Sequence, residues 1–230
     1  MKSNFNKIKK SFNKGLTLIE LMVVIGIFMV ITGIVIFNYG NFSSTVSLQN
    51  LTDDIAISIR KAQSFAIGAR GIETGTDRDF NKSYGMHFSV NESPSGSLSG
   101  SSRSFLMFSL PSSTPEDQKK YTDSSTSSSV CSVGNDCVEL FNITTLDKID
   151  SINAKVGVDY LTGSESSSVD LIFTRPDPRA YICYRIISSG ECEKNVSSVD
   201  IVVSNGQTDA DGTKKTKTIS VQNTGQISIQ

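Results

Sequence analysis

The pattern of hydrophobic and polar positions divides the chain into stretches that predict different elements. Residues 16–37 form an apolar run that contains one charged side chain, Glu20, and no proline. As an α-helix this run would be about 33 Å long, close to the ~30 Å hydrocarbon core of a bilayer. The run therefore predicts a helix that crosses a membrane once.

Residues 38–71 follow with a helical pattern that is apolar on one side only. Apolar side chains recur every three or four positions, and charged or amide side chains stand between them. This spacing is typical of an amphipathic helix with one buried stripe. Gly68 and Gly71 supply a stop signal. We expect one continuous helix over residues 16–69, and a break into two helices at Gly40 is the alternative.

Beyond residue 72 the pattern changes to alternation and short apolar runs, which predicts β-strands joined by turns. The candidate strands are residues 83–90, 104–110, 138–143, 155–158, 169–174, 180–187, 199–204, 217–221 and 226–229. Residues 91–103 and 111–129 are too polar to fill a core and are expected to be surface loops. The sequence thus predicts an α+β fold, in which a long N-terminal helix packs on an antiparallel β-sheet head of residues 72–230.

Residues 1–15 precede the apolar run as a polar leader with five lysines and no acidic residue. Positive charge on this side predicts that the leader stays in the cytoplasm and that the head is exported. The leader ends in Gly15 directly at the apolar border, whereas an ordinary secretory cleavage site has small residues after the apolar run. No such site follows Phe37. The start of the chain therefore differs from a secretory signal peptide.

Glu20 lies five residues into the apolar run. A charged side chain inside lipid costs about 2.5–3.5 kcal/mol on insertion scales, so this carboxylate needs a compensating partner. A cut after Gly15 would create a free amine on Leu16, which could supply the partner on a neighbouring copy. The alternative is a Glu20 side chain that reaches to the membrane surface.

Residues 14–20, which read KGLTLIE, resemble the class III signal of type IV prepilins and type II secretion pseudopilins. The resemblance implies that a prepilin peptidase cuts between Gly15 and Leu16 and methylates the new Leu16 amine. It also implies that Glu20 neutralises the amine of an adjacent subunit as the helices bundle into a filament. Phenylalanine is commoner at the position of Leu16, and this departure bears only on methylation.

Parts of the head extend the resemblance. Residues 60–66, 84–88 and 218–227 look like the helix, first strand and closing hairpin of H-type minor pseudopilins and related minor pilins. Many major pilins carry a proline 22 residues after the cleavage point, where this chain has Phe37. The resemblance implies a minor pilin or pseudopilin of a type IV pilus, competence or type II secretion filament.

The resemblance also implies where such a subunit is found and what it contacts. It would first span the inner or cytoplasmic membrane with its head on the exported side, and later join a periplasmic or cell-surface filament. Its partners would be prepilin peptidase and other pilins or pseudopilins. The alternative function is a binding module at the filament tip, for DNA or for a surface.

Four cysteines lie on the exported side, where an oxidising compartment favours disulfides over thiols. They are Cys131, Cys137, Cys183 and Cys192. Three connectivities are open. We expect local pairing, Cys131 with Cys137 and Cys183 with Cys192, because each pair brackets a turn-like segment.

The head offers little catalytic or metal-binding chemistry, and we expect no cofactor, no metal and no enzymatic activity. His87 is the sole histidine and is expected on the solvent-facing side of its strand. No G-x-S-x-G motif is present, and the cysteine spacings do not fit a zinc site. Residues 207–212 partly resemble a calcium loop, but Thr218 stands where a bidentate acid is required.

Charge gives no overall support for nucleic-acid binding. The chain has a formal net charge of −1, and without the leader lysines 17 basic and 23 acidic side chains remain, which gives −6. Lys214, Lys215 and Lys217 form a basic cluster and are the candidates for DNA contacts. No aromatic side chain stands between them to stack on bases. The pattern therefore favours a solvated strand face.

Overall fold

A computed structural model describes residues 15, 17–74, 77–90, 101–121, 137–163, 167–186, 191–208, 212 and 214–230. The chain divides into two units, residues 1–43 and residues 44–230. One helix, α1 (Leu18–Ile67), runs through 50 residues and belongs to both units. The helix continues through Gly40, so the alternative of two helices is wrong.

The part of α1 in the first unit is apolar and exposed around its circumference. Leu18–Phe37 has the length and composition of a membrane span, with a mean hydropathy of 2.7 and none of its best window buried. Phe28 is 69% exposed and Phe37 is 88% exposed. A helix that is hydrophobic all round suits a membrane or the inside of a bundle.

α1 ends in a Schellman motif, in which the second and third residues after the helix bond back to its last turn. The Ala69 N–H donates to the Ala66 carbonyl at 3.3 Å, and the Arg70 N–H donates to the Phe65 carbonyl at 3.1 Å. Ala69 has a φ of 49°. The helix thus stops where the sequence predicts, although the left-handed residue is an alanine between the two expected glycines.

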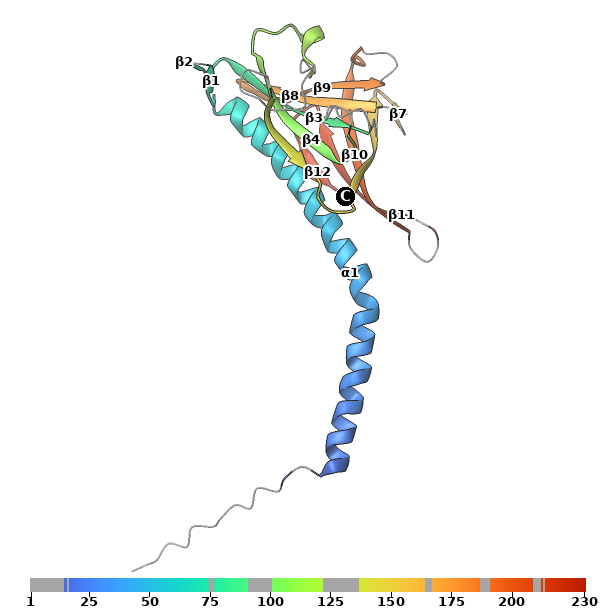
Figure 1. The fold of residues 1–230 in the computed structure, drawn as a ribbon. Helices are drawn as coiled ribbons and strands as arrows, with labels where there is room; N and C mark the ends of the chain where they lie inside the picture. The colour runs from blue at the N-terminus through green and yellow to red at the C-terminus, as the bar shows by residue number, and fades with distance from the viewer. Residues whose placement is uncertain are drawn as a thin grey trace, which may run out of the picture. The chain divides into compact units, whose positions relative to one another are not determined.

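The described residues of the head form three antiparallel sheets, and Figure 1 shows the strands of the head beside the second half of α1. A two-stranded sheet pairs β1 (Ile72–Thr74) with β2 (Asp77–Asp79). The first five-stranded sheet has the order β5 (Cys137–Asn142), β4 (Ser104–Pro111), β3 (Lys82–Ser89), β8 (Ser167–Thr174), β9 (Asp177–Ile186). The second has the order β12 (Ile227–Ile229), β11 (Lys214–Gln222), β10 (Val196–Thr208), β6 (Lys148–Val156), β7 (Asp159–Gly163). A single 3₁₀ turn, Glu116–Gln118, is seen among the described residues. The α+β fold class is confirmed.

One predicted strand is wrong. Residues 155–158 span the end of β6 and a turn into β7. Gly157 has a φ of 63°, in the left-handed region that glycine adopts without strain. The alternating Val156 and Val158 suggest a strand, but the glycine between them reverses the chain. The short strands β1, β2 and β7 were not predicted.

The second half of α1 and both five-stranded sheets share one hydrophobic core. The predicted helical stripe is buried, as Leu48, Leu51, Ile55, Ile59, Ala62 and Ala66. β3 contributes Tyr84, Met86 and Phe88 from the face that its alternation predicts. The head therefore folds around a helix face that was recognisable in the sequence.

A second, smaller cluster lies on the other face of β3, β4 and β8. It contains Leu106, Phe108, Tyr121 and Ile172. Gly85 makes room for it, since a Cβ at this position would lie 2.5 Å from the Phe108 ring. Tyr121 is 8% exposed, so the expectation of surface loops at 91–103 and 111–129 is wrong for part of their described residues. Ser102, at 2% exposed, is a further buried position. The Tyr121 side chain packs this polar segment against the sheet.

The C-terminal hairpin is fixed to α1 and β9. The Gln63 amide donates to the Pro178 carbonyl at 2.8 Å and to the Gly225 carbonyl at 3.3 Å. Gly225 has a φ of 88°, and a Cβ there would lie 2.2 Å from the Pro178 oxygen. This turn therefore requires glycine both for its backbone conformation and for its close approach.

Candidate functional site: the start of the helix and the surfaces of the head

Thr17 and Glu20 form a reciprocal cap at the start of α1. The Thr17 N–H and Oγ1 donate to Glu20 Oε2 at 2.8 and 2.9 Å. The Glu20 N–H donates to Thr17 Oγ1 at 3.3 Å. This is a capping box, which satisfies backbone donors that a helix start leaves without partners. The T-x-x-E spacing was visible in the sequence but was not interpreted as a cap.

The predicted cleavage site lies directly before this cap. Gly15 is exposed, and no atom lies within 4 Å of the position that a Cβ would take. Leu16 lies outside the described residues. Among the described residues, none crowds Gly15, and Glu20 lies in the first turn of α1. The glutamate is held by its own helix start, where the helix dipole favours a negative charge.

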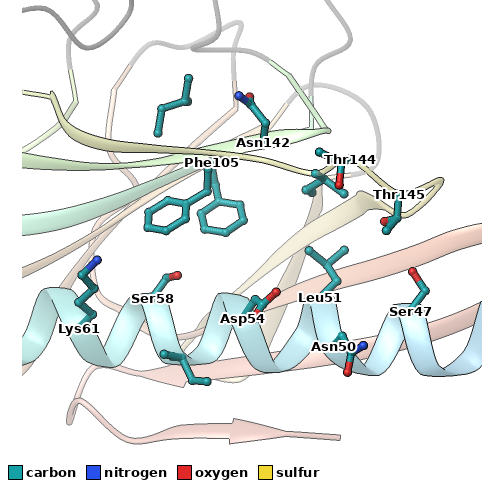
Figure 2. A pocket seen from close by; sticks show the side chains of 14 residues that line it. Ser47, Asn50, Leu51, Asp54, Ser58, Lys61, Phe105, Asn142, Thr144 and Thr145 are labelled. Atoms are coloured by element: carbon teal, nitrogen blue, oxygen red, sulfur yellow. The ribbon is translucent and has the colours of Figure 1, made fainter.

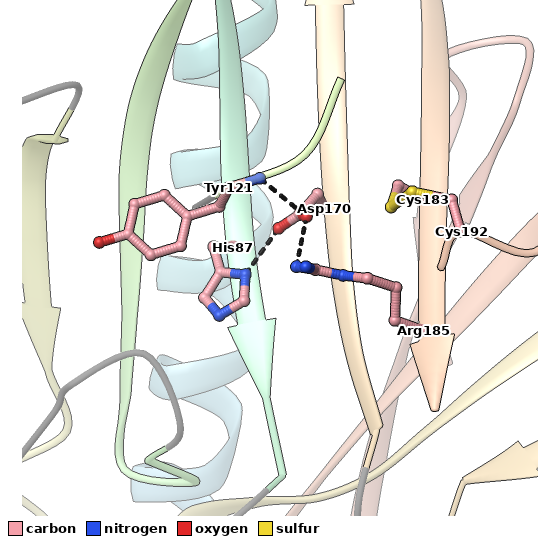
Figure 3. A network of polar contacts seen from close by, with 6 residues as sticks. All are labelled: His87, Tyr121, Asp170, Cys183, Arg185 and Cys192. Carbon is pink, nitrogen blue, oxygen red and sulfur yellow. Dashed lines mark hydrogen bonds and ion pairs between the residues drawn. A yellow bond between two sulfur atoms is a disulfide. The ribbon is translucent and has the colours of Figure 1, made fainter. Parts of the chain in front are cut away.

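His87 is buried, so its predicted place on a solvent-facing strand side is wrong. It is 4% exposed, and its Nδ1 lies 2.6 Å from Oδ1 of Asp170, a fully buried residue. Figure 3 shows Tyr121 and Arg185 meeting the same carboxylate. The Tyr121 N–H donates to Oδ2 at 3.0 Å, and Arg185 Nη2 donates to it at 2.7 Å.

This arrangement supports a structural role. A buried carboxylate is tolerated only when it is paired and hydrogen-bonded, and Asp170 receives partners from β3, β9 and the segment before residue 122. The Tyr121 ring also packs on His87, with 4.9 Å between ring centroids. The network thus joins three elements that are distant in sequence. The sequence around His87 and Asp170 does not indicate this pairing, because 83 residues separate the two side chains.

The Cys183–Cys192 disulfide is present and confirms one predicted pair. It joins β9 to the segment that leads into β10, next to the network (Figure 3). Cys137 is also disulfide-bonded. Its predicted partner, Cys131, lies outside the described residues.

A groove of about 620 Å³ lies between the second half of α1 and the edge of the first large sheet (Figure 2). Its apolar part includes Phe105 and Phe141, whose rings stack at 4.9 Å. Asp54 and Lys61 line it from the helix, and Lys61 forms an ion pair with Glu139 at 2.6 Å. The groove offers an apolar contact surface with charges at its rim.

The three predicted lysines lie on β11. Lys214 Nζ lies 3.2 Å from Asp150 Oδ1, with 53% of its side chain exposed. Part of the predicted calcium loop, residues 209–211, lies outside the described residues. Within the described part of the chain, no group of three or more His, Cys, Asp or Glu side chains could hold a metal.

Comparison with known proteins identifies the start of the chain. A family model described as "Prokaryotic N-terminal methylation motif" matches residues 10–36. No curated protein and no solved structure matches the chain. The match covers Gly15, Glu20 and most of the apolar run, and it confirms the class III signal that residues 14–20 predict.

Proposed function

We propose that this protein is a minor pilin or pseudopilin, a structural subunit of a type IV pilus, competence or type II secretion filament. The methylation motif at residues 10–36, at the start of an exposed apolar helix, carries the proposal. A prepilin peptidase cuts between Gly15 and Leu16 and methylates the Leu16 amine. The apolar half of α1 anchors the subunit in the membrane and then becomes part of the filament core.

Glu20 gives this assembly its register. Removal of residues 1–15 leaves a positive amine on Leu16, four positions before Glu20. Two opposite charges about 4 Å apart attract by about 4 kcal/mol at the effective dielectric constant near a protein surface. A subunit whose Leu16 amine lies beside Glu20 of its neighbour is therefore stabilised more by this attraction than a subunit shifted by one helical turn.

The pairing is directional. The Leu16 amine of one subunit pairs with the Glu20 carboxylate of the next. Each added subunit therefore brings one more amine and one more carboxylate, and the same contact repeats along the filament. A head-to-tail contact of this kind produces an open helical filament when its rotation does not close a ring. The capping box supports this role because Thr17 supplies donors to the carboxylate while the subunit waits in the membrane.

Substitution of Glu20 tests the proposal in cells that contain an active prepilin peptidase and the cognate filament machine. Glu20→Ala is expected to be cleaved and to remain in the membrane, while its amount in sheared filaments falls at least about tenfold. Thr17→Val is the matched control, because it removes the cap hydroxyl and keeps the carboxylate. Normal incorporation of Glu20→Ala would contradict the pairing, and absence of the unchanged chain from all filaments would contradict the proposed function.

A further inference from the structure

The turn between β6 and β7 carries two exposed side chains with large apolar surfaces. Val158 is 90% exposed and Tyr160 is 57% exposed. Gly157, with its φ of 63°, reverses the chain directly before them. We call Val158 and Tyr160 the hairpin tip. Single exposed apolar side chains are common on protein surfaces, so the relevant question is whether the chain also carries a surface that would cover this tip.

The groove between the second half of α1 and β5 is such a surface. The stacked rings of Phe105 and Phe141 line one side of it, and Ile57, 59% exposed, lines the helix side. Figure 2 shows Phe105 facing the helix across the groove. Its volume of about 620 Å³ lies in the range of roughly 300–1,000 Å³ that holds drug-sized ligands. The groove therefore has room for one valine and one tyrosine side chain.

The charges of the hairpin tip and of the groove are opposite. The Lys155 ammonium lies 5.4 Å from the centroid of the Tyr160 ring, and Asp54 is exposed at the groove. Among the described residues, neither Lys155 nor Asp54 forms an ion pair. Lys155 and Tyr160 are cross-strand partners on one face of the hairpin, whereas Asp159 alternates to the other face. The tip thus presents a positive charge beside its tyrosine, and the groove presents a negative one.

The hairpin tip and the groove belong to different sides of the head. β5 and β7 are outer strands of different sheets. In Figure 1, β7 lies on the side of the head away from the second half of α1. The tip of a head therefore does not enter its own groove, but the tip of a second copy can. A contact that uses two different surfaces leaves one of each free, so it can repeat from copy to copy.

We propose that the hairpin tip of one head docks into the groove of a second copy of this chain. Val158 and Tyr160 then pack against Phe105 and Phe141 of the second copy, and Lys155 faces its Asp54. The inference rests on the proposed function, because it is a contact between neighbouring subunits of a filament.

This contact is small and needs the filament to form. Two side chains bury far less area than the roughly 1,200 Å² of a stable interface, so the contact alone does not hold two heads together. In a filament, the bundled helices keep neighbouring heads at a high effective concentration, which makes a weak contact persist. Its role is therefore to fix the orientation of each head relative to the next, while Glu20 acts on the helices.

Cross-linking within filaments tests the docking. Two differently tagged full-length copies, one with Val158→Cys and one with Ile57→Cys, are produced together in cells with an active prepilin peptidase and the cognate filament machine. Sheared filaments are treated with a short bismaleimide, and the product that carries both tags is measured. Leu146→Cys combined with Ile57→Cys is the matched control, because Leu146 is 78% exposed but precedes the other end of β6. Among the described residues no native cysteine is free to react.

The product of Val158→Cys with Ile57→Cys is expected to exceed that of the control pair at least about tenfold, since only docked neighbours hold the two thiols together. Lys155→Glu, added to the copy with Val158→Cys, places a second negative charge opposite Asp54. It should lower the product by up to about fivefold, the range of exposed ion pairs. Asp54→Lys, added to the other copy, should restore the product.

Four outcomes would overturn the inference. Filaments that contain both tagged copies but give no product with both tags would exclude the docking and leave the filament proposal intact. Equal products from Val158→Cys and Leu146→Cys would show that the heads meet without a defined contact. Capture of Val158→Cys on a different filament subunit would assign the hairpin tip to another partner. Absence of the unchanged chain from all filaments would remove the proposed function and this inference together.

Discussion

The two parts of α1, residues 18–43 and residues 44–67, are one helix with two different sequence patterns. In the first part apolar side chains point in all directions, and Phe37 is 88% exposed. In the second part they fall on one stripe, and Ile55 and Ile59 are fully buried. The arrangement of apolar residues around the helix therefore decides which part joins the core of the head.

This contrast shows where each part obtains its stability. Burial of one large apolar side chain contributes about 1.5–3 kcal/mol, so the first part is stable only if lipid or other helices cover it. The second part is covered by strands of its own chain. We therefore expect the head to fold independently of the apolar part, and the apolar part to need a partner that the chain does not supply.

The largest expected effect comes from a cavity in the head core. Ile59→Ala should destabilise the head by about 2–5 kcal/mol, because Ile59 is fully buried. The same truncation in the first part, Ile27→Ala, should leave head stability unchanged, since Ile27 is 57% exposed. Urea unfolding of the detergent-solubilised chain, followed by the near-UV signal of the head, measures both.

Ile57→Ala provides the control inside the second part. Ile57 is two positions away from Ile59 but is 59% exposed, so its truncation should change head stability by less than about 0.5 kcal/mol. Equal losses for Ile27→Ala and Ile59→Ala would mean that the two parts of α1 do not differ as described.

The next effect concerns the covalent link in the head. Cys183→Ser combined with Cys192→Ser opens a loop of nine residues and should cost about 2–3 kcal/mol. Thermal unfolding of the head should move to lower temperature, and reductant should then have less effect on the variant than on the unchanged chain. The helix content of the apolar part should not change. An unaltered melting temperature would show that this disulfide does not stabilise the head.

Gly225→Ala should cost about 1–3 kcal/mol, because its positive φ and the nearby Pro178 oxygen both disfavour a side chain. Gly206→Ala separates the two causes. Gly206 has a φ of 70° and nothing within 4 Å of a Cβ, so only the backbone cost remains. Denaturant unfolding should rank Gly225→Ala as the less stable variant, and the reverse order would contradict the close packing of the hairpin on β9.

The smallest effect concerns high pH. Burial raises the pKa of Tyr84, whose hydroxyl donates to the Arg70 carbonyl at 2.6 Å. A raised pKa means that the folded head holds the Tyr84 proton more tightly than the unfolded chain does. The resulting stabilisation of the head is fully present below the ordinary pKa of about 10 and is lost as the pH rises through the raised pKa. Stability measured between about pH 9 and 11 should fall less steeply for Tyr84→Phe than for the unchanged chain. Parallel curves would contradict this assignment.

The sequence was sufficient for several features whose pattern is local, although residues 155–158 show that a local pattern can also mislead. Apolar spacing predicted the continuous helix and its buried stripe, and alternation predicted the inward face of β3. The nine-residue separation of Cys183 and Cys192 allowed their pairing to be predicted. Each of these features depends on residues that are close together in the sequence. Hydrophobic periodicity and turn residues are therefore enough to predict them.

Features that depend on distant pairing were not predictable from single segments. His87 lies opposite Asp170 because β3 pairs with β8 in one register, and the Tyr121 ring, from a segment distant in sequence, packs against it. The division into two large sheets has the same origin, since it depends on which strands meet. At the candidate site, the sequence predicted roles for Gly15 and Glu20 from a local motif that the family model also matches, whereas the contacts of His87 with Asp170 follow from strand pairing.

The mass of the mature chain tests the central claim most directly. The protein is purified from cells with an active prepilin peptidase and is analysed intact by mass spectrometry, with a peptidase-deficient strain as the control. The account predicts a chain that begins at Leu16 and carries one added methyl group in the first strain, and the full-length precursor in the second. Retention of residues 1–15 in both strains would contradict the account.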